Sequence, residues 1–366
     1  MTSAEILKQT PLYQDHLSLK AKMVSFGGWS MPVQYTGILD EYWQCRKAAA
    51  LFDICHMGEF IVEGDLALEC LQKVFTADLS TLAVNRSRYG LMLNENGGVS
   101  DDLIIFRLAE KKFFLVVNAA NSDKDFACVQ KAVCSKARCE NISDKTGKLD
   151  LQGPFAREAL ASVCPDIVKL KYFQCAPFSL LGEECLISRT GYTGELGYEI
   201  FYPWAKTKIL WKKILENDKV KPAGLGARDV LRIEMAYSLY GHELSDTISP
   251  LEAGLDSFID FKKDFIGKGA LLKQKKDGTA RRMIYFVSSD RRSPRQSYGI
   301  FSSDKKALGV VTSGTFSPSL EKGIGIGLLS PKVDLTGTSI LFGSGSNLIS
   351  AQVCEKPFYR QGTLKN

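Results

Sequence analysis

Residues 94–103 read Asn94-Glu95-Asn96-Gly97-Gly98-Val99-Ser100-Asp101-Asp102-Leu103. A polar, glycine-rich turn leads here into an apolar run, and two adjacent aspartates stand where that run begins. Because strand residues alternate between faces, Asp101 and Asp102 are predicted to point in opposite directions. One carboxylate can then be a surface group, while the other is a candidate for a placed carboxylate in an apolar site.

The neighbouring runs predict a three-stranded antiparallel meander around this turn. Residues 89–93 and 113–117 read as strands, and a short polar segment before the second run is typical of a hairpin turn. The meander would bring Tyr89, Asp101 and Asn118 to one end of the sheet. A simpler interpretation remains open, in which Asp101 only caps the turn and Asn118 only ends a strand, because both are ordinary turn residues.

The composition is that of a globular protein with several domains. The chain has 366 residues, of which 45% are hydrophobic and 24% charged, and this length suits two or three domains. No apolar run approaches the roughly 20 residues that span a bilayer, so no membrane partner is expected. The first residues lack the apolar core of a signal peptide. A cytoplasmic location is the resulting expectation.

Several kinds of site find no support in the sequence. The ten cysteines contain no Cys-x-x-Cys pair and His16, His56 and His242 are dispersed, so no metal centre is predicted. No Gly-x-Gly-x-x-Gly fingerprint is present, which argues against a built-in flavin or nicotinamide domain. The net charge of +6 suits an acidic partner or an anionic substrate. Nucleic-acid binding is not predicted, because no basic face with stacking aromatics is evident.

The chain changes character at about residue 272. Residues 1–272 mix strands and helices, with helices predicted at 65–74, 123–133, 203–214 and 227–240. Residues 273–282 are polar and basic and are predicted to be a linker. Residues 283–366 contain short β runs separated by Gly, Ser and Pro, which predict a small barrel or sandwich.

Motifs spread along the chain carry a resemblance to a known family. They are Phe26-Gly27-Gly28-Trp29-Ser30-Met31-Pro32-Val33-Gln34-Tyr35, Phe52-Asp53-Ile54-Cys55-His56-Met57-Gly58, Gly97-Gly98-Val99-Ser100-Asp101-Asp102-Leu103, Gly224-Leu225-Gly226-Ala227-Arg228-Asp229 and Val311-Thr312-Ser313-Gly314-Thr315-Phe316-Ser317-Pro318. Each motif is weak alone. In this order and over this length, the chain resembles the aminomethyltransferase, or T-protein, family of the glycine cleavage system.

The resemblance implies both a fold and a reaction. The fold is an α+β, three-domain, ring-like arrangement, in which two interleaved folate-binding domains in residues 1–272 are closed by a C-terminal β-barrel. The family binds tetrahydrofolate as co-substrate, with no metal or flavin. Its partner, the lipoylated H-protein, presents an aminomethyl group. The reaction gives methylene-tetrahydrofolate, ammonia and dihydrolipoyl H-protein. A monomer is expected.

The resemblance also implies roles for single residues. Asp101 matches the catalytic carboxylate, Glu199 the acid that grips the pterin, and Arg228 the binding arginine. The remaining implied folate contacts are Tyr192, Tyr89, Asn118, Met57 and Arg360. Structural alternatives remain open, since Glu199 and Arg228 can also form a buried ion pair and Tyr192 can be a packing aromatic.

The same superfamily also includes proteins with other functions. Sarcosine and dimethylglycine dehydrogenases join this module to a flavin domain, for which this chain has no fingerprint. A non-catalytic folate-binding branch, which assists iron–sulfur maintenance, carries a Lys-Gly-Cys-Tyr-x-Gly-Gln-Glu motif. This chain instead reads Lys263-Asp264-Phe265-Ile266-Gly267-Lys268, without the cysteine. That difference favours the transferase, while a degenerate folate binder without turnover stays open.

Overall fold

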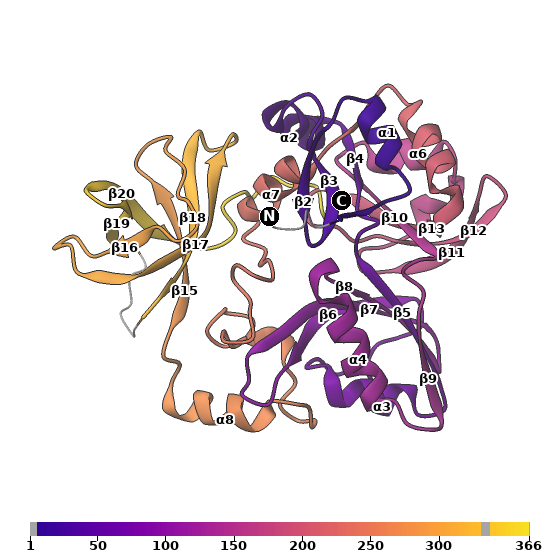
Figure 1. Cartoon of the computed structure of the whole chain (residues 1–366), viewed down its shortest axis with the longest axis horizontal. Coiled ribbons are helices and arrows are strands. Elements are labelled where there is room, and N and C mark those ends of the chain that lie inside the picture. Colours follow the sequence, from indigo (N-terminus) through magenta and orange to yellow (C-terminus); the bar gives the residue numbers. More distant parts are fainter. Residues whose placement is uncertain (1–5, 331–336, 366) are drawn as a thin grey trace.

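The computed structural model of this chain describes residues 6–330 and 337–365. Within this range the strands form four sheets, which build three lobes around a common centre (Figure 1). One lobe holds a six-stranded sheet, the second a five-stranded sheet, and the third, in orange and yellow, is a closed barrel. The predicted α+β fold with three domains is therefore confirmed.

The five-stranded sheet is inserted into the six-stranded one. The chain enters the six-stranded sheet at β4 (Ala49–Asp53) and then leaves it to build the whole five-stranded sheet. It returns at β10 (Thr146–Gln152), which pairs antiparallel with β4. This return confirms the predicted interleaving of the two N-terminal domains.

Strand order follows from that insertion. The five-stranded sheet has the order β6-β7-β8-β5-β9 and the six-stranded sheet the order β11-β12-β13-β10-β4-β14. The strands of the first are β5 (Gly58–Gly64), β6 (Arg86–Leu93), β7 (Val99–Ala109), β8 (Lys112–Val117) and β9 (Ala137–Asn141). The further strands of the second are β11 (Cys175–Leu180), β12 (Glu183–Ser188), β13 (Gly197–Pro203) and β14 (Val220–Pro222).

The predicted meander is present as β6, β7 and β8. The register places Met92 opposite Asp101, and Ile104 opposite Val116. Side chains alternate along β7, so Leu103 and Ile105 belong to the core under the helices, whereas Ile104 lies on the other face. The same alternation separates the two aspartates.

The two faces of the five-stranded sheet have different neighbours. Helices α3 (Ala67–Val74) and α4 (Ser122–Ala132) cover one face and bury a core that includes Phe60, Phe75 and Phe113. The other face meets the six-stranded sheet through aromatic contacts. The ring centroids of Phe114 and Phe201 lie 4.8 Å apart, edge to face. The candidate active site lies at this junction of the two sheets.

The N-terminal segment and the remaining helices complete the two domains. The small three-stranded sheet contains β1 (Lys8–Gln9), β2 (Lys22–Phe26) and β3 (Trp29–Gln34). The helices are α1 (Tyr13–Ser18), α2 (Ile38–Lys47), α5 (Ala156–Ala161), α6 (Thr207–Leu215), α7 (Leu225–Glu234) and α8 (Lys268–Asp277). Single 3₁₀ turns are η1 (Ala119–Asn121), η2 (Pro165–Lys169), η3 (Trp204–Lys206) and η4 (Asp256–Phe258).

Two predicted helices have different bounds in the structure. The helix predicted at 227–240 is α7, which ends at Glu234 because Ala236 adopts a left-handed backbone with φ of 56°. The helix predicted at 203–214 begins only at Thr207, after the turn η3. Ile209 lies off the apolar face of this helix and is 54% exposed. Leu210, Trp211 and Ile214 form that face instead.

The C-terminal domain is a barrel, and the expected linker before it is shorter. Helix α8 occupies the first half of segment 273–282, so only residues 278–281 join it to the first barrel strand. The barrel strands are β15 (Arg282–Ser288), β16 (Gly299–Phe301), β17 (Ala307–Ser317), β18 (Lys322–Leu329), β19 (Ser339–Ser344) and β20 (Asn347–Cys354). They close in the order β15-β18-β17-β16-β19-β20. Closure removes exposed sheet edges.

A buried arginine ties α2 to the rest of the molecule. The Arg46 guanidinium donates to the Thr193 carbonyl at 2.7 Å, to Glu195 at 2.8 Å and to Glu234 at 2.6 Å. Glu234 also accepts a hydrogen bond from Ser317 of the barrel. The Arg46 side chain is only 2% exposed, so these charges compensate one another away from water.

Replacing this arginine should destabilise the fold. In Arg46→Met, Glu195 and Glu234 stay buried without their counter-charge, and we expect a loss of about 3–5 kcal/mol in the free energy of unfolding. Urea unfolding followed by circular dichroism measures this loss. Lys169→Met, which removes an exposed ion pair with Asp166, should leave the unfolding midpoint unchanged. Equal midpoints for both variants would contradict the assignment.

Candidate active site

The aspartate that points under the helices is Asp101. It is 0% exposed and lies between the sheet and the start of α4. Its Oδ2 accepts the Asn118 backbone N–H at 3.0 Å, and its Oδ1 accepts the side-chain amides of Asn118 at 2.8 Å and of Asn121 at 2.7 Å. Both oxygens are thus held by amide donors. Asp101 and Asn118 lie together as the sequence predicted.

A second buried acid stands behind Asp101. Asp125 lies one helical turn after Asn121 on α4, and its side chain is fully buried. Burial and the Asp101 charge raise the pKa of Asp125 to about 11, so this carboxyl is protonated at neutral pH. Sequence reasoning missed Asn121 and Asp125. Their spacing of four residues, facing one side of a helix, was the available signal.

The aspartate that faces the junction of the two sheets is Asp102. It is partly exposed, and it accepts the Tyr89 hydroxyl at 3.0 Å and the Asn118 amide at 2.9 Å. Burial, followed by the Asp101 charge, raises the pKa of Asp102 to about 7. A carboxyl group with this pKa can accept and release protons near neutral pH. Tyr89 therefore meets Asp102, and the predicted group of Tyr89, Asp101 and Asn118 is assembled around both aspartates.

The second part of the site is a group of four buried or half-buried charges. Glu199 on β13 and Arg228 on α7 do not pair with each other, which was one of the open alternatives. Lys148 Nζ lies 2.8 Å from Glu199 Oε1, and Asp150 forms an ion pair with Arg228. Lys148 and Asp150 are two residues apart on β10, so their side chains share one face of the sheet.

The pKa values in this group follow from burial and from the pairing. Burial opposes ionisation of Glu199, but the Lys148 ammonium and the Thr190 hydroxyl outweigh it and lower its pKa. Burial raises the pKa of Asp150 to about 6, although the Arg228 charge acts in the opposite direction. Glu199 is consequently a carboxylate acceptor at neutral pH.

Tyr192 connects the two parts of the site. The Arg228 guanidinium lies 5.1 Å from the centroid of the Tyr192 ring, and the phenol also experiences the Asp102 charge. Tyr192 stacks on Tyr237 with centroids 5.6 Å apart, and its hydroxyl donates to the Ser238 carbonyl. It is therefore both a packing aromatic and a neighbour of the site charges.

Of the last two predicted folate contacts, Met57 lies at the site and Arg360 lies away from it. The Met57 sulfur lies 3.5 Å from Lys148 Nζ, at the edge of the charged group. Arg360 follows the barrel and is exposed, with a long hydrogen bond of 3.4 Å to the Pro357 carbonyl. Among the described contacts, none joins Arg360 to the other predicted site residues. The structure thus brings together the predicted residues other than Arg360.

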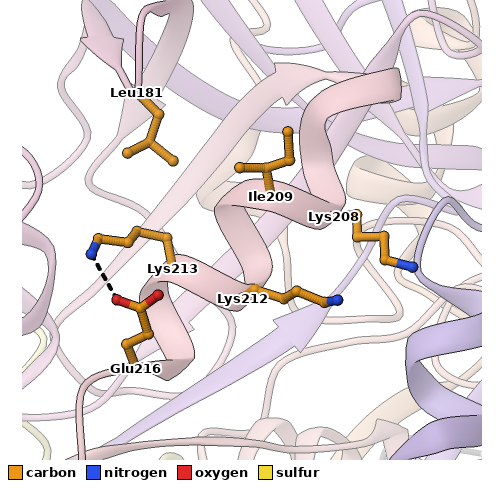
Figure 2. Close-up of a pocket in the computed structure, with 6 residues that line it drawn as sticks. All are labelled: Leu181, Lys208, Ile209, Lys212, Lys213 and Glu216. Atoms are coloured by element: carbon orange, nitrogen blue, oxygen red, sulfur yellow. Dashed lines mark hydrogen bonds and ion pairs between the residues drawn. The ribbon is translucent and has the colours of Figure 1, made fainter.

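A surface depression on α6 is separate from this site. Figure 2 shows Leu181, Lys208, Ile209, Lys212, Lys213 and Glu216 around it. Lys213 pairs with Glu216 at 2.7 Å, and Lys208 and Lys212 lie near Asp15. None of the predicted site residues lines it, so we assign it no part in the reaction.

Family models match both parts of the chain. The GCVT N-terminal domain matches residues 12–263, and the glycine cleavage T-protein C-terminal barrel domain matches residues 281–360. This chain belongs to the glycine cleavage T-protein family. The matched ranges agree with the division into an interleaved N-terminal region and a barrel.

Similar proteins cover the full length of this T-protein family member. An aminomethyltransferase of Pseudothermotoga lettingae is 44% identical over 98% of this chain and 100% of its own length. One from Natranaerobius thermophilus is 44% identical over 97% and 99%. The crystal structure of glycine cleavage system aminomethyltransferase T from Bartonella henselae superposes with a TM-score of 0.92, at 34% identity, covering 98% of this chain and 99% of that one.

No helix in residues 6–330 and 337–365 is long and apolar enough to cross a membrane. The same residues contain no group of three or more His, Cys, Asp or Glu side chains arranged to hold a metal ion.

The raised pKa of Asp102 leads to a direct test. A ¹³C NMR titration of labelled aspartates should show a carboxyl group with a pKa of about 7 that disappears in Asp102→Asn. An unfolded aspartate has a pKa of about 3.9, so the ionisation of Asp102 lowers stability progressively as the pH rises from about 4 to about 7. Asp102→Asn, which cannot ionise, should gain stability relative to wild type over that window.

The matched control is Asp123→Asn, an exposed residue on α4, which should keep the signal. The assignment is wrong if the signal near pH 7 persists in Asp102→Asn, or if it is missing from the wild type.

Proposed function

We propose that this aminomethyltransferase moves the methylene carbon of a lipoyl-bound aminomethyl group to tetrahydrofolate. The products are methylene-tetrahydrofolate, ammonia and a dihydrolipoyl carrier, the H-protein of the glycine cleavage system. The observation that carries this proposal is Asp102, a partly exposed carboxyl group with a pKa near 7 whose neighbour Tyr192 also contacts Arg228 of the charged group. No described feature favours the non-catalytic folate-binding alternative.

The charged group on β10, β13 and α7 suits one end of the folate. Glu199 can accept two hydrogen bonds from the adjacent N–H donors of an aminopyrimidine ring. Arg228 offers a planar fork of donors, and Tyr192 offers a flat aromatic face beside it. Tyr89, Asn118 and Met57 would complete the wall of the folate-binding site. Arg360 stays a prediction, since its exposed guanidinium suits only an outlying, anionic part of the ligand.

The aspartate pair suits the protons of the reaction. When two folate nitrogens bond to the transferred carbon they release two protons, one of which ends on ammonia and the other on the dihydrolipoyl sulfur. Asp102 would accept and deliver such protons, and its charge would stabilise positive charge developing on the carbon. We expected Asp101 in this role. Because Asp101 is buried and held by amides, we propose that it acts through Asp102, as a positioning residue that raises its pKa.

The test is tetrahydrofolate-dependent ammonia release from aminomethyl-loaded lipoyl carrier. Asp102→Asn should lower kcat at least about tenfold, or roughly 1.4 kcal/mol of barrier, while tetrahydrofolate binding is kept. Asp101→Asn should also lower the rate, because an amide at this position disturbs the donors from Asn118 and Asn121. Asp123→Asn should match the wild type. A wild type that binds folate but releases no ammonia would leave the non-catalytic folate binder as the function.

The positive net charge of the protein leads to a test of how it encounters the carrier. A positive protein that meets an acidic carrier gains mainly in association rate, and salt screens that attraction over about 8–10 Å. Raising the salt concentration should therefore lower the rate at limiting carrier and leave kcat at saturating carrier unchanged. A rate at limiting carrier that does not respond to salt would contradict an electrostatically guided encounter.

A further inference from the structure

Lys148 is a buried ammonium group whose role goes beyond its ion pair. Its side chain is 2% exposed, and it lies on β10, which pairs with β13, the strand that carries Glu199. Among its described contacts, one is the short bond to Glu199, one is the long contact with the Met57 sulfur, and one is the Phe201 ring at 5.1 Å. An ammonium carries three N–H donors. Among these contacts, the N–H group that points to Glu199 has a strong acceptor.

Lys148 extends the hydrogen-bonding edge that Glu199 presents. Thr190 donates to Glu199 Oε2, and Lys148 donates to Glu199 Oε1. Lys148 and Glu199 together thus offer two acceptors, Oε2 and Oε1, and one donor, Nζ, which is hydrogen-bonded to Oε1. Each carboxylate oxygen keeps lone pairs for a further donor, because a carboxylate has about four acceptor sites.

This set of acceptors and donor is complementary to one class of heterocycle. A 2-amino-4-oxopteridine presents the 2-amino N–H, the N3–H and the O4 oxygen along one edge, which is a donor, a donor and an acceptor. A 4-amino analogue presents a donor, an acceptor and a donor along the same edge. Its ring nitrogen would face Glu199 Oε1, and its 4-amino group would face the ammonium of Lys148.

We propose that Lys148 is a specificity-determining residue that donates a hydrogen bond to the 4-oxo group of the pterin and thereby selects 4-oxo over 4-amino ligands. This inference rests on the proposed function, because it assumes that Glu199 grips the pterin. Discrimination is strong where the wrong ligand leaves buried polar groups without partners. With a 4-amino ligand, two acceptors face each other at Glu199 Oε1 and two donors face each other at Lys148.

A purely structural role for Lys148 makes a different prediction. If Lys148 only keeps Glu199 ionised, its removal lowers the affinities for 4-oxo and 4-amino ligands by the same factor. If Lys148 donates to the 4-oxo group, its removal lowers the affinity for the 4-oxo ligand more than the affinity for the 4-amino ligand. The ratio of the two affinities therefore separates the roles.

The experiment measures dissociation constants for tetrahydrofolate and its 4-amino analogue by isothermal titration calorimetry. The full-length proteins are wild type, Lys148→Met, and the matched control Lys145→Met, an exposed lysine just before β10. We expect wild type and the control to prefer tetrahydrofolate by about 100-fold or more. In Lys148→Met the tetrahydrofolate affinity should fall at least about tenfold, and the preference should shrink because the affinity for the 4-amino analogue falls by a smaller factor.

In Lys148→Met the buried Glu199 loses its counter-charge, which can impair folding. A second pair of variants, both carrying Glu199→Gln, tests the same role of Lys148 without this problem. Glu199→Gln removes the negative charge first, so the double variant Glu199→Gln, Lys148→Met holds no unpaired buried charge. The preference for the 4-oxo ligand should be lower in the double variant than in Glu199→Gln alone. An unchanged preference, with both ligands weakened equally, would overturn the role of Lys148. A wild type that binds neither ligand would overturn the proposed function itself.

Discussion

The register of β10 between β4 and β13 is the constraint on which the site depends. Asp150 lies opposite Phe52 on one side and opposite Glu199 on the other. Because side chains alternate, a shift of one residue would turn Lys148 and Asp150 to the opposite face of the sheet. Glu199 and Arg228 would then lose their present partners. The pairing of three strands thus sets the charge arrangement at the junction of the two N-terminal domains.

Charge compensation explains why so many ionisable groups can be buried here. Lys148 with Glu199, and Asp150 with Arg228, form neighbouring pairs of opposite sign. The aspartates follow another principle, because the Asp101 carboxylate accepts hydrogen bonds from the side-chain amides of Asn118 and Asn121. Burial and the nearby Asp101 charge raise the pKa of Asp102 to about 7. The site therefore contains one aspartate enclosed by amide donors and a second whose pKa lies near neutral pH.

The sequence predicted the parts of this arrangement that local patterns control. Alternation around the Asn94–Leu103 turn was enough for the meander and for the opposite faces of Asp101 and Asp102. It could not tell which aspartate faces the site, because this depends on the helix α4 that packs over Asp101. Lys148 and Asp150 were missed because their alternation with Leu149 and Leu151 resembles a strand with one solvated face, whereas β10 is buried on both. The end of α7 at Glu234 depends on the backbone of Ala236, which no side-chain pattern announces.

The insertion of one domain between β4 and β10 has a consequence for how the chain folds. The antiparallel pairing of Asp53 with Leu149 closes a loop that contains the whole five-stranded sheet. Closing such a loop from a disordered chain costs more entropy than closing it around a domain that is already compact, because a compact insert holds its own ends near each other. We therefore expect the inserted sheet to form early and the six-stranded sheet to be completed around it. The order of synthesis and the order of assembly differ in this protein, since β4 leaves the ribosome first and must wait for β10.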